Sequence, residues 1–199
     1  MPDETGDQRM ALERRKIVET ALGLLDDVGM DGLSTRRLAA ELGVKGPSLY
    51  WHFKNMRELT DHMAEALLES ALPAPDAFPH DWPAWLAEGA RGIRRAALSR
   101  RDGGRLLAAS RPTGRSAGVT FPAMAGRLES EGFRLEEARS TLMGLARYAM
   151  GWALYEQLAP NRAANSDEAF EFGLQAMIAG IALNVPAASL PTGQKLRPA

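Results

Sequence analysis

The stretch from residue 32 to 53, GLSTRRLAAELGVKGPSLYWHF, restricts the possible folds more than any other part of this chain. Ser34 and Thr35 place hydroxyls at the start of a first helix, where one can cap a free backbone N–H. That helix has one apolar face, formed by Leu38, Ala39 and Leu42. Gly43 follows the last apolar residue, where a left-handed backbone conformation costs glycine little. The pattern predicts a short helix that ends in a tight turn.

A second short helix is expected over residues 47–53, because proline is well tolerated in a first helical turn. This helix is too short to form a core element, yet it carries a cluster of hydrogen-bonding side chains: Ser48, Tyr50, Trp51 and His52. Leu49 and Phe53 are four residues apart and are expected to face the core of their own domain. Two short helices around a glycine turn are typical of a helix-turn-helix whose second helix enters the DNA major groove.

The composition fits a globular protein that carries its positive charge at one end. The 199 residues are enough for one domain, or for a small domain joined to a larger one. The net charge is −1, but residues 9–57 hold nine Lys or Arg against six Asp or Glu. A basic first segment on an acidic remainder suits a DNA-binding domain carried by a larger domain.

Several classes of protein are made improbable by what the sequence lacks. The absence of cysteine excludes disulfides, thiolate metal sites and cysteine nucleophiles, and it fits a reducing cytoplasm. The first residues, MPDETGDQRM, have no apolar h-region, so we expect no signal peptide. No run of about 18 apolar residues is present, so we expect no membrane contact and a cytoplasmic location.

Helical periodicity dominates the chain, and no stretch makes a convincing strand. The predicted fold class is therefore all-α, with an N-terminal three-helix helix-turn-helix domain and a larger helical domain. Outside the helix-turn-helix, helices are expected at residues 8–28, 56–72, 83–99, 105–109, 119–130, 135–158 and 167–183. The predicted domains are 1–56 for DNA binding, 57–185 for ligand binding and dimerisation, and 186–199 as a flexible tail.

The last two predicted helices are rich in apolar and small residues, so they need a packing partner. A symmetric dimer would bury them in a four-helix bundle. The alternative is that they pack only on the rest of their own domain. We expect the homodimer.

Residues 16–64 closely resemble the DNA-binding domain of the tetracycline-repressor (TetR) family. The resemblance rests on IVETALGLLDDVGMDGLSTRRLAAELGV and PSLYWHFKNMRELTDHMA, in which LYWHFKN after a glycine turn is highly specific. Further along, IRRAALSRRDGGRLLAASRP, ESEGF and DEAFEFGLQAMIAGI resemble the ligand-binding and dimerisation domain of the tetracycline-repressor branch. The resemblance implies an all-α homodimer that blocks transcription until a small molecule releases it from its operator. No cofactor is expected.

The resemblance assigns contacts with double-stranded DNA to the following residues: Thr35, Arg36, Lys45, Gly46, Pro47, Ser48, Tyr50, Trp51, His52 and Lys54. An arginine such as Arg36 can meet guanine O6 and N7, although Arg36 or its neighbour Arg37 can equally be a solvated surface charge. Ser48 can instead cap the helix, and Trp51 can pack under the motif. Gly46 stands where tetracycline repressors typically carry a glutamine that reads a base, so the operator is expected to differ from theirs.

The effector is also expected to differ from that of the tetracycline repressors. In that branch a histidine on the short central helix and a glutamate on the next long helix hold a magnesium–drug chelate. The matching positions here are Leu107 and Tyr155, while two further drug-contacting positions become Ala71 and Gly89. Magnesium requires oxygen ligands. Glu156 is adjacent, but one residue along a helix turns the side chain by about 100°. We therefore expect no metal site and no response to tetracycline–magnesium.

A mostly apolar effector pocket is expected from the positions that match the family: Leu107, Arg111, Phe121, Met124, Met143, Arg147, Trp152 and Tyr155. Arg111 and Arg147 can receive an anionic or carbonyl group of a ligand, or they can form ordinary salt bridges. Aromatic and methionine side chains at helical spacing are also consistent with plain core packing.

The function expected from the sequence is that of a repressor which binds a palindromic operator as a homodimer and is released by a small, mostly apolar effector. An activator of the same fold is an alternative, as is an architectural DNA-binding protein without an effector. A cofactor-free helical enzyme is a further alternative. However, the three histidines are scattered, and no G-x-S-x-G, P-loop or G-x-G-x-x-G is present.

Overall fold

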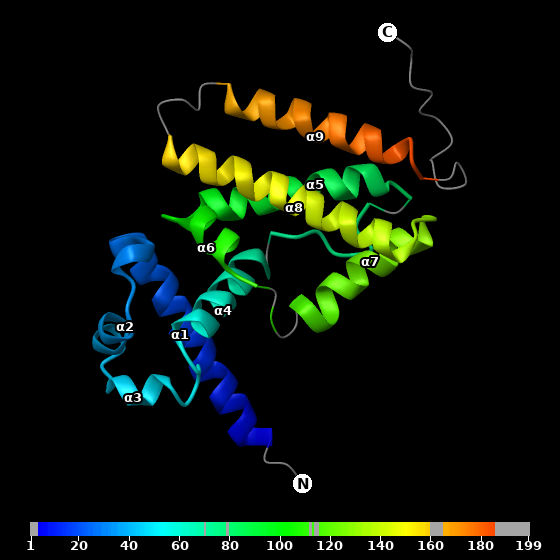
Figure 1. Ribbon diagram of the computed structural model, residues 1–199. Coiled ribbons are helices and arrows are strands. Elements are labelled where there is room, and N and C mark those ends of the chain that lie inside the picture. Colours follow the sequence, from blue (N-terminus) through cyan, green and yellow to red (C-terminus); the bar gives the residue numbers. More distant parts are fainter. Residues whose placement is uncertain are drawn as a thin grey trace.

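The computed structural model describes residues 4–69, 71–78, 80–111, 113, 116–159 and 165–185. This described part is helical and contains no strand, which confirms the all-α prediction (Figure 1). Its helices are α1 (Glu4–Gly32), α2 (Thr35–Glu41), α3 (Gly46–Leu49), α4 (Met56–Glu69), α5 (Trp82–Leu98), α6 (Gly103–Ala109), η1 (Ser116–Thr120), α7 (Phe121–Ser130), α8 (Leu135–Leu158) and α9 (Ser166–Ala182). The predicted tail at 186–199 lies outside the described residues. None of the described helices is long and apolar enough to cross a membrane.

Several helix boundaries differ from the prediction, and three of them differ for local reasons. The prediction of a helix over 47–53 was wrong in length, because α3 is a single turn that ends at Leu49 and is followed by turn residues. Helix α1 continues past the predicted end at Val28, but Gly29 interrupts it with φ 70° and ψ 178°. A π-helical turn, η1, precedes α7 where one helix was expected to begin at residue 119.

The N-terminal unit, called the head below, consists of α1, α2, α3 and the first turns of α4. Its small core is built from side chains that are almost fully buried: Ala21, Leu25, Leu38, Leu49, Phe53, Leu59 and Met63. Because these side chains come from all four helices, α2 and α3 are fixed against α1 and α4 rather than against each other alone.

The rest of the described chain forms the core domain, in which α5 and α8 make the most extensive helix pair. Trp82, Trp85, Leu106, Leu128 and Phe170 are among its fully buried side chains. Helix α4 contacts α1 on one side and α5 and α6 on the other, so it links the head to the core domain. Helix α9 runs alongside α8 at the far end of the molecule from the head (Figure 1).

Charged side chains hold α9 to α5 and α8. Arg94 of α5 donates to Glu156 of α8 at 2.8 Å and to Asp167 of α9 at 2.5 Å, and its guanidinium lies 4.8 Å from the centre of the Phe170 ring. Arg91 makes a two-bond ion pair with Glu171, both bonds being 2.7 Å long. These contacts fix the position of α9 and leave its outer face uncovered.

Candidate functional site

The helix-turn-helix is set by local backbone chemistry, as the sequence predicts. Oγ of Ser34 accepts a hydrogen bond from the backbone N–H of Arg37 at 3.3 Å and caps α2. Gly43 follows α2 with φ 66°, a backbone conformation that residues other than glycine disfavour. Pro47 lies in the first turn of α3, where its missing N–H leaves no helical bond unmade.

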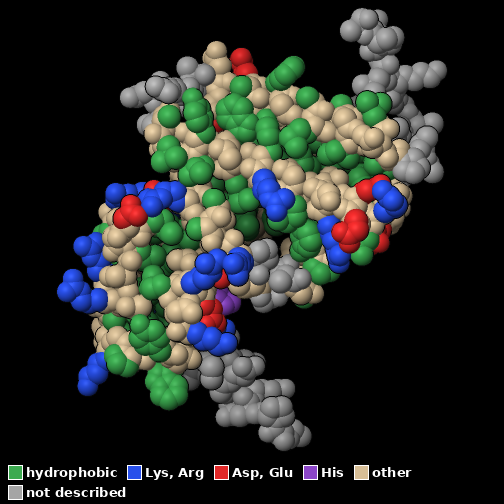
Figure 2. All heavy atoms as spheres, viewed as in Figure 1, with side chains coloured by type: hydrophobic (Ala, Val, Ile, Leu, Met, Phe, Trp, Pro, Cys, Tyr) green, Lys and Arg blue, Asp and Glu red, His purple; other side chains and the backbone are tan. Residues whose placement is uncertain are grey.

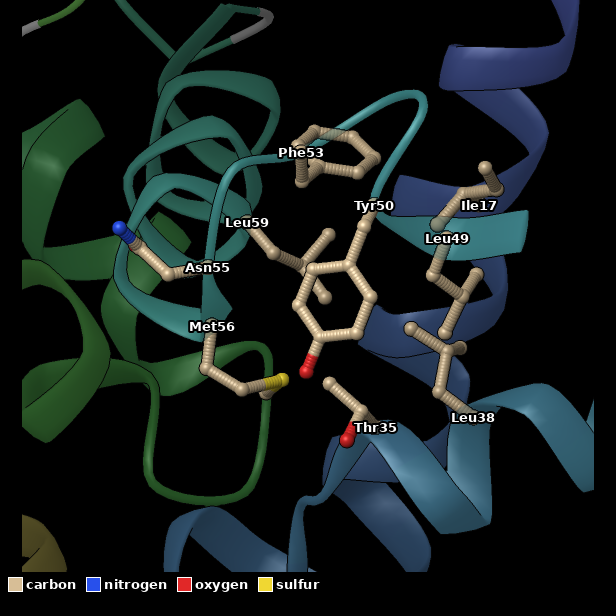
Figure 3. A pocket seen from close by; sticks show the side chains of 9 residues that line it. All are labelled: Ile17, Thr35, Leu38, Leu49, Tyr50, Phe53, Asn55, Met56 and Leu59. Carbon is tan, nitrogen blue, oxygen red and sulfur yellow. The ribbon is translucent and has the colours of Figure 1, made fainter. Parts of the chain in front are cut away.

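The residues after Gly46 include two buried apolar side chains and two exposed aromatic side chains. Leu49 and Phe53 are buried, with about 5% of their surface exposed, as predicted. Tyr50 is 55% exposed and Trp51 is 86% exposed. The alternative that Trp51 packs under the motif therefore has no support. Figure 3 shows the phenol of Tyr50 directed between Thr35 and Met56, so its ring lies across the joint between α2 and α4.

His52 differs from its aromatic neighbours because its side chain is turned toward α1. Its imidazole is 16% exposed, and Nε2 lies 3.7 Å from a carboxylate oxygen of Glu13. Arg14 donates to the backbone oxygen of His52 at 2.8 Å and to Glu58 at 3.0 Å, and its guanidinium lies 4.9 Å from the centre of the Phe53 ring. Arg14 therefore positions the end of the recognition turn. No local sequence pattern indicates this role, since 38 residues separate Arg14 from His52.

The head also carries exposed cationic side chains in the helix-turn-helix that holds Tyr50 and Trp51. Arg36, Lys45 and Lys54 are exposed, and their side chains form no ion pair with other described residues. Arg37 behaves differently, since its Nη1 atom folds back to within 3.1 Å of the place where a Cβ on Gly32 would be. Figure 2 shows Lys and Arg side chains projecting from the edge of the head over α2 and α3. Both arginines considered in the sequence are therefore exposed, and only Arg37 lies against the end of α1.

The remaining candidates of the DNA group lie in and beside α3. Pro47 and Ser48 are exposed, whereas Thr35 and Gly46 are partly buried. Thr35 also lines a cavity of about 10 Å³ beneath the turn, together with Leu38, Leu49 and Met56 (Figure 3). This space holds about one water molecule, so it is a gap in the packing and not a ligand site.

The structure gathers only part of the predicted effector group. Leu107 is buried in α6, and Phe121, Met124 and Met143 are partly buried where α7 packs on α8. Arg111 and Arg147 are exposed, and neither side chain has an ion-pair partner among the residues described. The contact that Arg111 makes with α4 comes from its backbone, because its N–H donates a hydrogen bond to Oδ1 of Asp61 at 2.9 Å.

Two members of the predicted effector group lie on another flank of α8. Met143 and Trp152 are nine residues apart, which places them about 180° apart around the helix. Trp152 belongs to an aromatic cluster with Tyr148, Tyr155 and Phe170, with ring centres 6.3 to 6.5 Å from its own. Within one chain, Trp152 and Tyr155 therefore face α9, and Met143 does not share a pocket with them.

Glu156 is fully engaged within the core domain. It is 8% exposed, accepts hydrogen bonds from Arg94 and accepts another from Oγ of Ser166. Its oxygens therefore point toward α5 and α9 and are not available to a ligand beside Leu107. No group of three or more His, Asp or Glu side chains that could hold a metal ion occurs in the described part of the chain.

Helix α6 is bound directly to the head. Oδ2 of Asp102 accepts a hydrogen bond from the backbone N–H of Met30 at 2.8 Å. Arg105 pairs with Asp31 at 2.8 Å, and Arg100 pairs with Asp26 at 2.5 Å. The guanidinium of Arg105 also holds the pKa of the Asp31 carboxyl below its ordinary value through a hydrogen bond. These contacts join the last turns of α1 to the segment that carries Leu107.

The segment after α6 is bound to α4 in the same way. Oγ of Ser110 donates to the backbone oxygen of Thr60 at 3.2 Å, and Oγ1 of Thr113 donates to Glu65 at 2.8 Å. Together with the bond between Arg111 and Asp61, these contacts attach the exit of α6 to one side of α4. The segment around α6 is therefore bonded to both α1 and α4.

Comparisons with known proteins agree with this architecture. The family profile "Bacterial regulatory proteins, tetR family" matches residues 17–63, and the profile "Tetracyclin repressor-like, C-terminal domain" matches residues 73–165. The chain is 36% identical over 200 residues to the class A tetracycline repressor of transposon 1721 from Escherichia coli; the match covers 86% of this chain and 91% of that protein.

Solved structures give the same result. A TetR variant from Acinetobacter baumannii AYE in complex with minocycline superposes with a TM-score of 0.76 at 39% identity, covering 86% of this chain and 97% of that one. The Streptomyces coelicolor protein ActR in complex with (S)-DNPA gives 0.74 at 30% identity, with 86% and 98% covered. The relatives are DNA-binding regulators and not enzymes, so the helical-enzyme alternative is set aside. The chain belongs to the TetR family of ligand-responsive transcriptional repressors.

Proposed function

We propose that this chain acts in the cytoplasm as a homodimer that binds a palindromic operator through the turn at residues 45–54. Trp51 is the observation that carries the proposal. Its side chain is 86% exposed, while the two residues that anchor the same turn, Leu49 and Phe53, are buried. An indole held outward on a fixed turn, with the free cations Arg36, Lys45 and Lys54 around it, is suited to a sugar-phosphate backbone.

The proposed dimer forms through α8 and α9. Large apolar side chains on these helices and just after α9 are exposed in the single chain: Tyr155, Leu158, Phe172 and Leu183. Phe172 and Leu183 are more than three-quarters exposed, which a second copy would cover in a two-fold arrangement. The two heads would then project from the same side of the dimer, with residues 1–56 as the DNA-binding domain and 57–185 as the ligand-binding and dimerisation domain.

The effector we propose is small and mostly apolar, and it binds beside α6. Leu107 offers no oxygen to a metal ion, and Glu156 is already paired with Arg94. The relatives whose complexes are solved hold different ligands, minocycline in one case and (S)-DNPA in the other. Because these two relatives bind different ligands, we propose that the effector of this chain differs from theirs.

Release from DNA would follow from the contacts of α6. The helix is bound to α1 through Asp102 and Arg105, and its exit is bound to α4 through Ser110 and Thr113. An effector that fits only a displaced α6 would favour a different spacing of the two heads. The operator affinity would fall by the coupling free energy between the two sites.

Selection of binding sequences from random DNA tests the operator. We expect an inverted repeat with half-site centres about 10 base pairs or a multiple apart. A gel shift with the selected site should weaken steeply as salt rises. Recovery of no common sequence would contradict the proposal. A reporter that rises in the presence of the protein would favour the activator.

Calorimetric titration with tetracycline, with and without magnesium, tests the effector. We expect no magnesium-dependent heat. Micromolar binding that requires magnesium would contradict our assignment of Leu107 and Tyr155. A thermal-shift screen of lipophilic aromatic compounds identifies candidates, because a ligand that binds only the folded state raises the melting temperature.

A further inference from the structure

A second groove lies at the junction of the head and the core domain. Its walls come from α1, α4 and α5, from Ala71 after α4, and from Ser99 and Arg100 before α6, so no residue of α6, α7 or α8 lines it. The groove has a volume of about 380 Å³. The groove is open to solvent, so an occupant would be only partly covered. It shares no lining residue with the predicted effector group around Leu107, although Ala71 matches a drug-contacting position of the tetracycline repressors.

The lining combines apolar side chains with two guanidiniums. Leu67 of α4 and the small exposed parts of Leu22 and Ala96 give a limited apolar surface, and most of the exposed lining is polar. Ser99 lies near Arg95 and Arg100 at the end of α5. No carboxylate lines the groove. Arg95 donates to Glu88 at 2.6 Å and Arg100 donates to Asp26 at 2.5 Å, and both carboxylates lie outside the lining.

Each guanidinium keeps further hydrogen-bond donors after these ion pairs. A guanidinium has five N–H groups, and the side chains of Arg95 and Arg100 are 61% and 38% exposed. A carboxylate or sulfonate accepts such bonds in pairs. An apolar body attached to that anion would cover Leu22, Leu67 and Ala96.

We propose that this groove binds a small amphipathic anion, with an acidic group against Arg95 and Arg100 and a ring system against the apolar lining. The occupant would touch the head through Leu22, the linking helix through Leu67 and the core domain through Ala96. Its affinity would depend on the angle between these elements, so it would bias the spacing of the heads independently of the effector beside α6.

The absence of cysteine in this chain allows a direct test. The variant Ser99→Cys places the only thiol at the groove, because Ser99 is exposed and lines it. The variant Ser140→Cys is the matched control, since Ser140 is exposed on α8 and lies outside the groove. The rate of reaction with the uncharged reagent 4,4′-dithiodipyridine is measured with 1-naphthoate, and again with 1-naphthalenemethanol, which has a similar shape and no charge.

A probe of this size should bind with a Kd of about 1 mM, so about 5 mM 1-naphthoate should slow the Ser99→Cys reaction about sixfold. The neutral analogue should slow it less than about twofold by the same relation. The Ser140→Cys rate should not change. No protection by naphthoate, equal protection by the neutral analogue, or equal protection of both thiols would overturn the proposal.

A second variant tests the role of the guanidinium. Arg95→Gln in the Ser99→Cys background should abolish most of the protection by naphthoate. Arg139→Gln is the matched control, because Arg139 is also about half exposed and pairs with one carboxylate of its own helix. If naphthoate still protects the thiol in Arg95→Gln, the proposal that an anionic group binds beside Arg95 is wrong. A thermal melt of each variant shows that the fold is kept.

Discussion

The backbone N–H of Met30 donates a 2.8 Å hydrogen bond to Oδ2 of Asp102, which joins the end of α1 to the start of α6 across 72 residues of sequence. Gly29 makes this contact possible, because its φ of 70° turns the chain and a Cβ there would lie 2.7 Å from the same oxygen. The head and the core domain are therefore joined at a point whose backbone conformation favours glycine.

Gly29→Ala should destabilise the protein and weaken operator binding. The backbone of Gly29, with φ 70° and ψ 178°, lies in a region that essentially only glycine adopts, at a cost of about 1–3 kcal/mol for another residue. The clash with Asp102 adds to that cost. Urea unfolding measures the loss of stability. Gly23→Ala is the control, since Gly23 lies in the same helix with no neighbour within 4 Å, and it should gain up to about 1 kcal/mol. Equal effects of the two substitutions would argue against the joint at Gly29.

Lys45→Ala and Lys54→Ala should each reduce the salt dependence of operator binding. Each lysine is exposed and has no ion pair in the described part of the chain, so it is free to neutralise a phosphate. The slope of log K against log salt should fall by about 1 for each lysine removed. Arg139→Ala, remote on α8, should leave the slope unchanged. An unchanged slope in both lysine variants would remove these residues from the interface.

The ion pair between Arg91 and Glu171 should make stability depend on pH. The hydrogen bonds from Arg91 hold the pKa of Glu171 below its ordinary value. Because the folded-state pKa is the lower one, the stabilisation is present above the unfolded-state pKa and is lost as pH falls through the folded-state pKa. The pair is partly exposed, so its contribution is below about 1 kcal/mol.

Glu171→Gln should therefore be less stable than the natural protein at pH 6, and the difference should shrink as the pH falls below the ordinary pKa of a glutamate. Chemical unfolding across this range measures the difference. Glu168→Gln, on the same helix with an exposed carboxylate and no ion pair among the described residues, should show no such trend. A constant difference between Glu171→Gln and the natural protein at all pH values would contradict the role given to the ion pair.

Phe172→Glu should dissociate the proposed dimer. Phe172 is 79% exposed on the outer face of α9, and two-fold symmetry would bring the change into the interface twice. A central apolar contact of this kind should raise the dimer Kd by about 30-fold or more. Analytical ultracentrifugation measures the shift. Phe78→Glu, an exposed position in the loop before α5, should leave the dimer intact. A dimer that resists Phe172→Glu would exclude this face.

Features that depend on neighbouring residues could be predicted from the sequence. Oγ of Ser34 caps α2 and Gly43 takes the left-handed turn because both effects act within four residues. The burial of Leu49 and Phe53 followed from their spacing in the same way.

Features that depend on long-range packing could not be predicted. The inward turn of His52 requires Glu13 and Arg14 of α1, and the joint at Gly29 requires Asp102. The family resemblance suggested Trp152 as a ligand candidate, but the position of α9 decides that its ring packs against Phe170.

Fluorescence anisotropy with the selected operator tests the central claim most directly, using the natural protein, Trp51→Ala and Val119→Ala. Trp51 is 86% exposed, so its removal should leave the melting temperature unchanged. The account predicts that Trp51→Ala weakens operator binding about tenfold or more, equivalent to about 1.4 kcal/mol. Val119, 57% exposed in η1, should be replaceable without effect. Operator affinity equal to that of the natural protein in Trp51→Ala would contradict the claim that this turn is the DNA-reading surface.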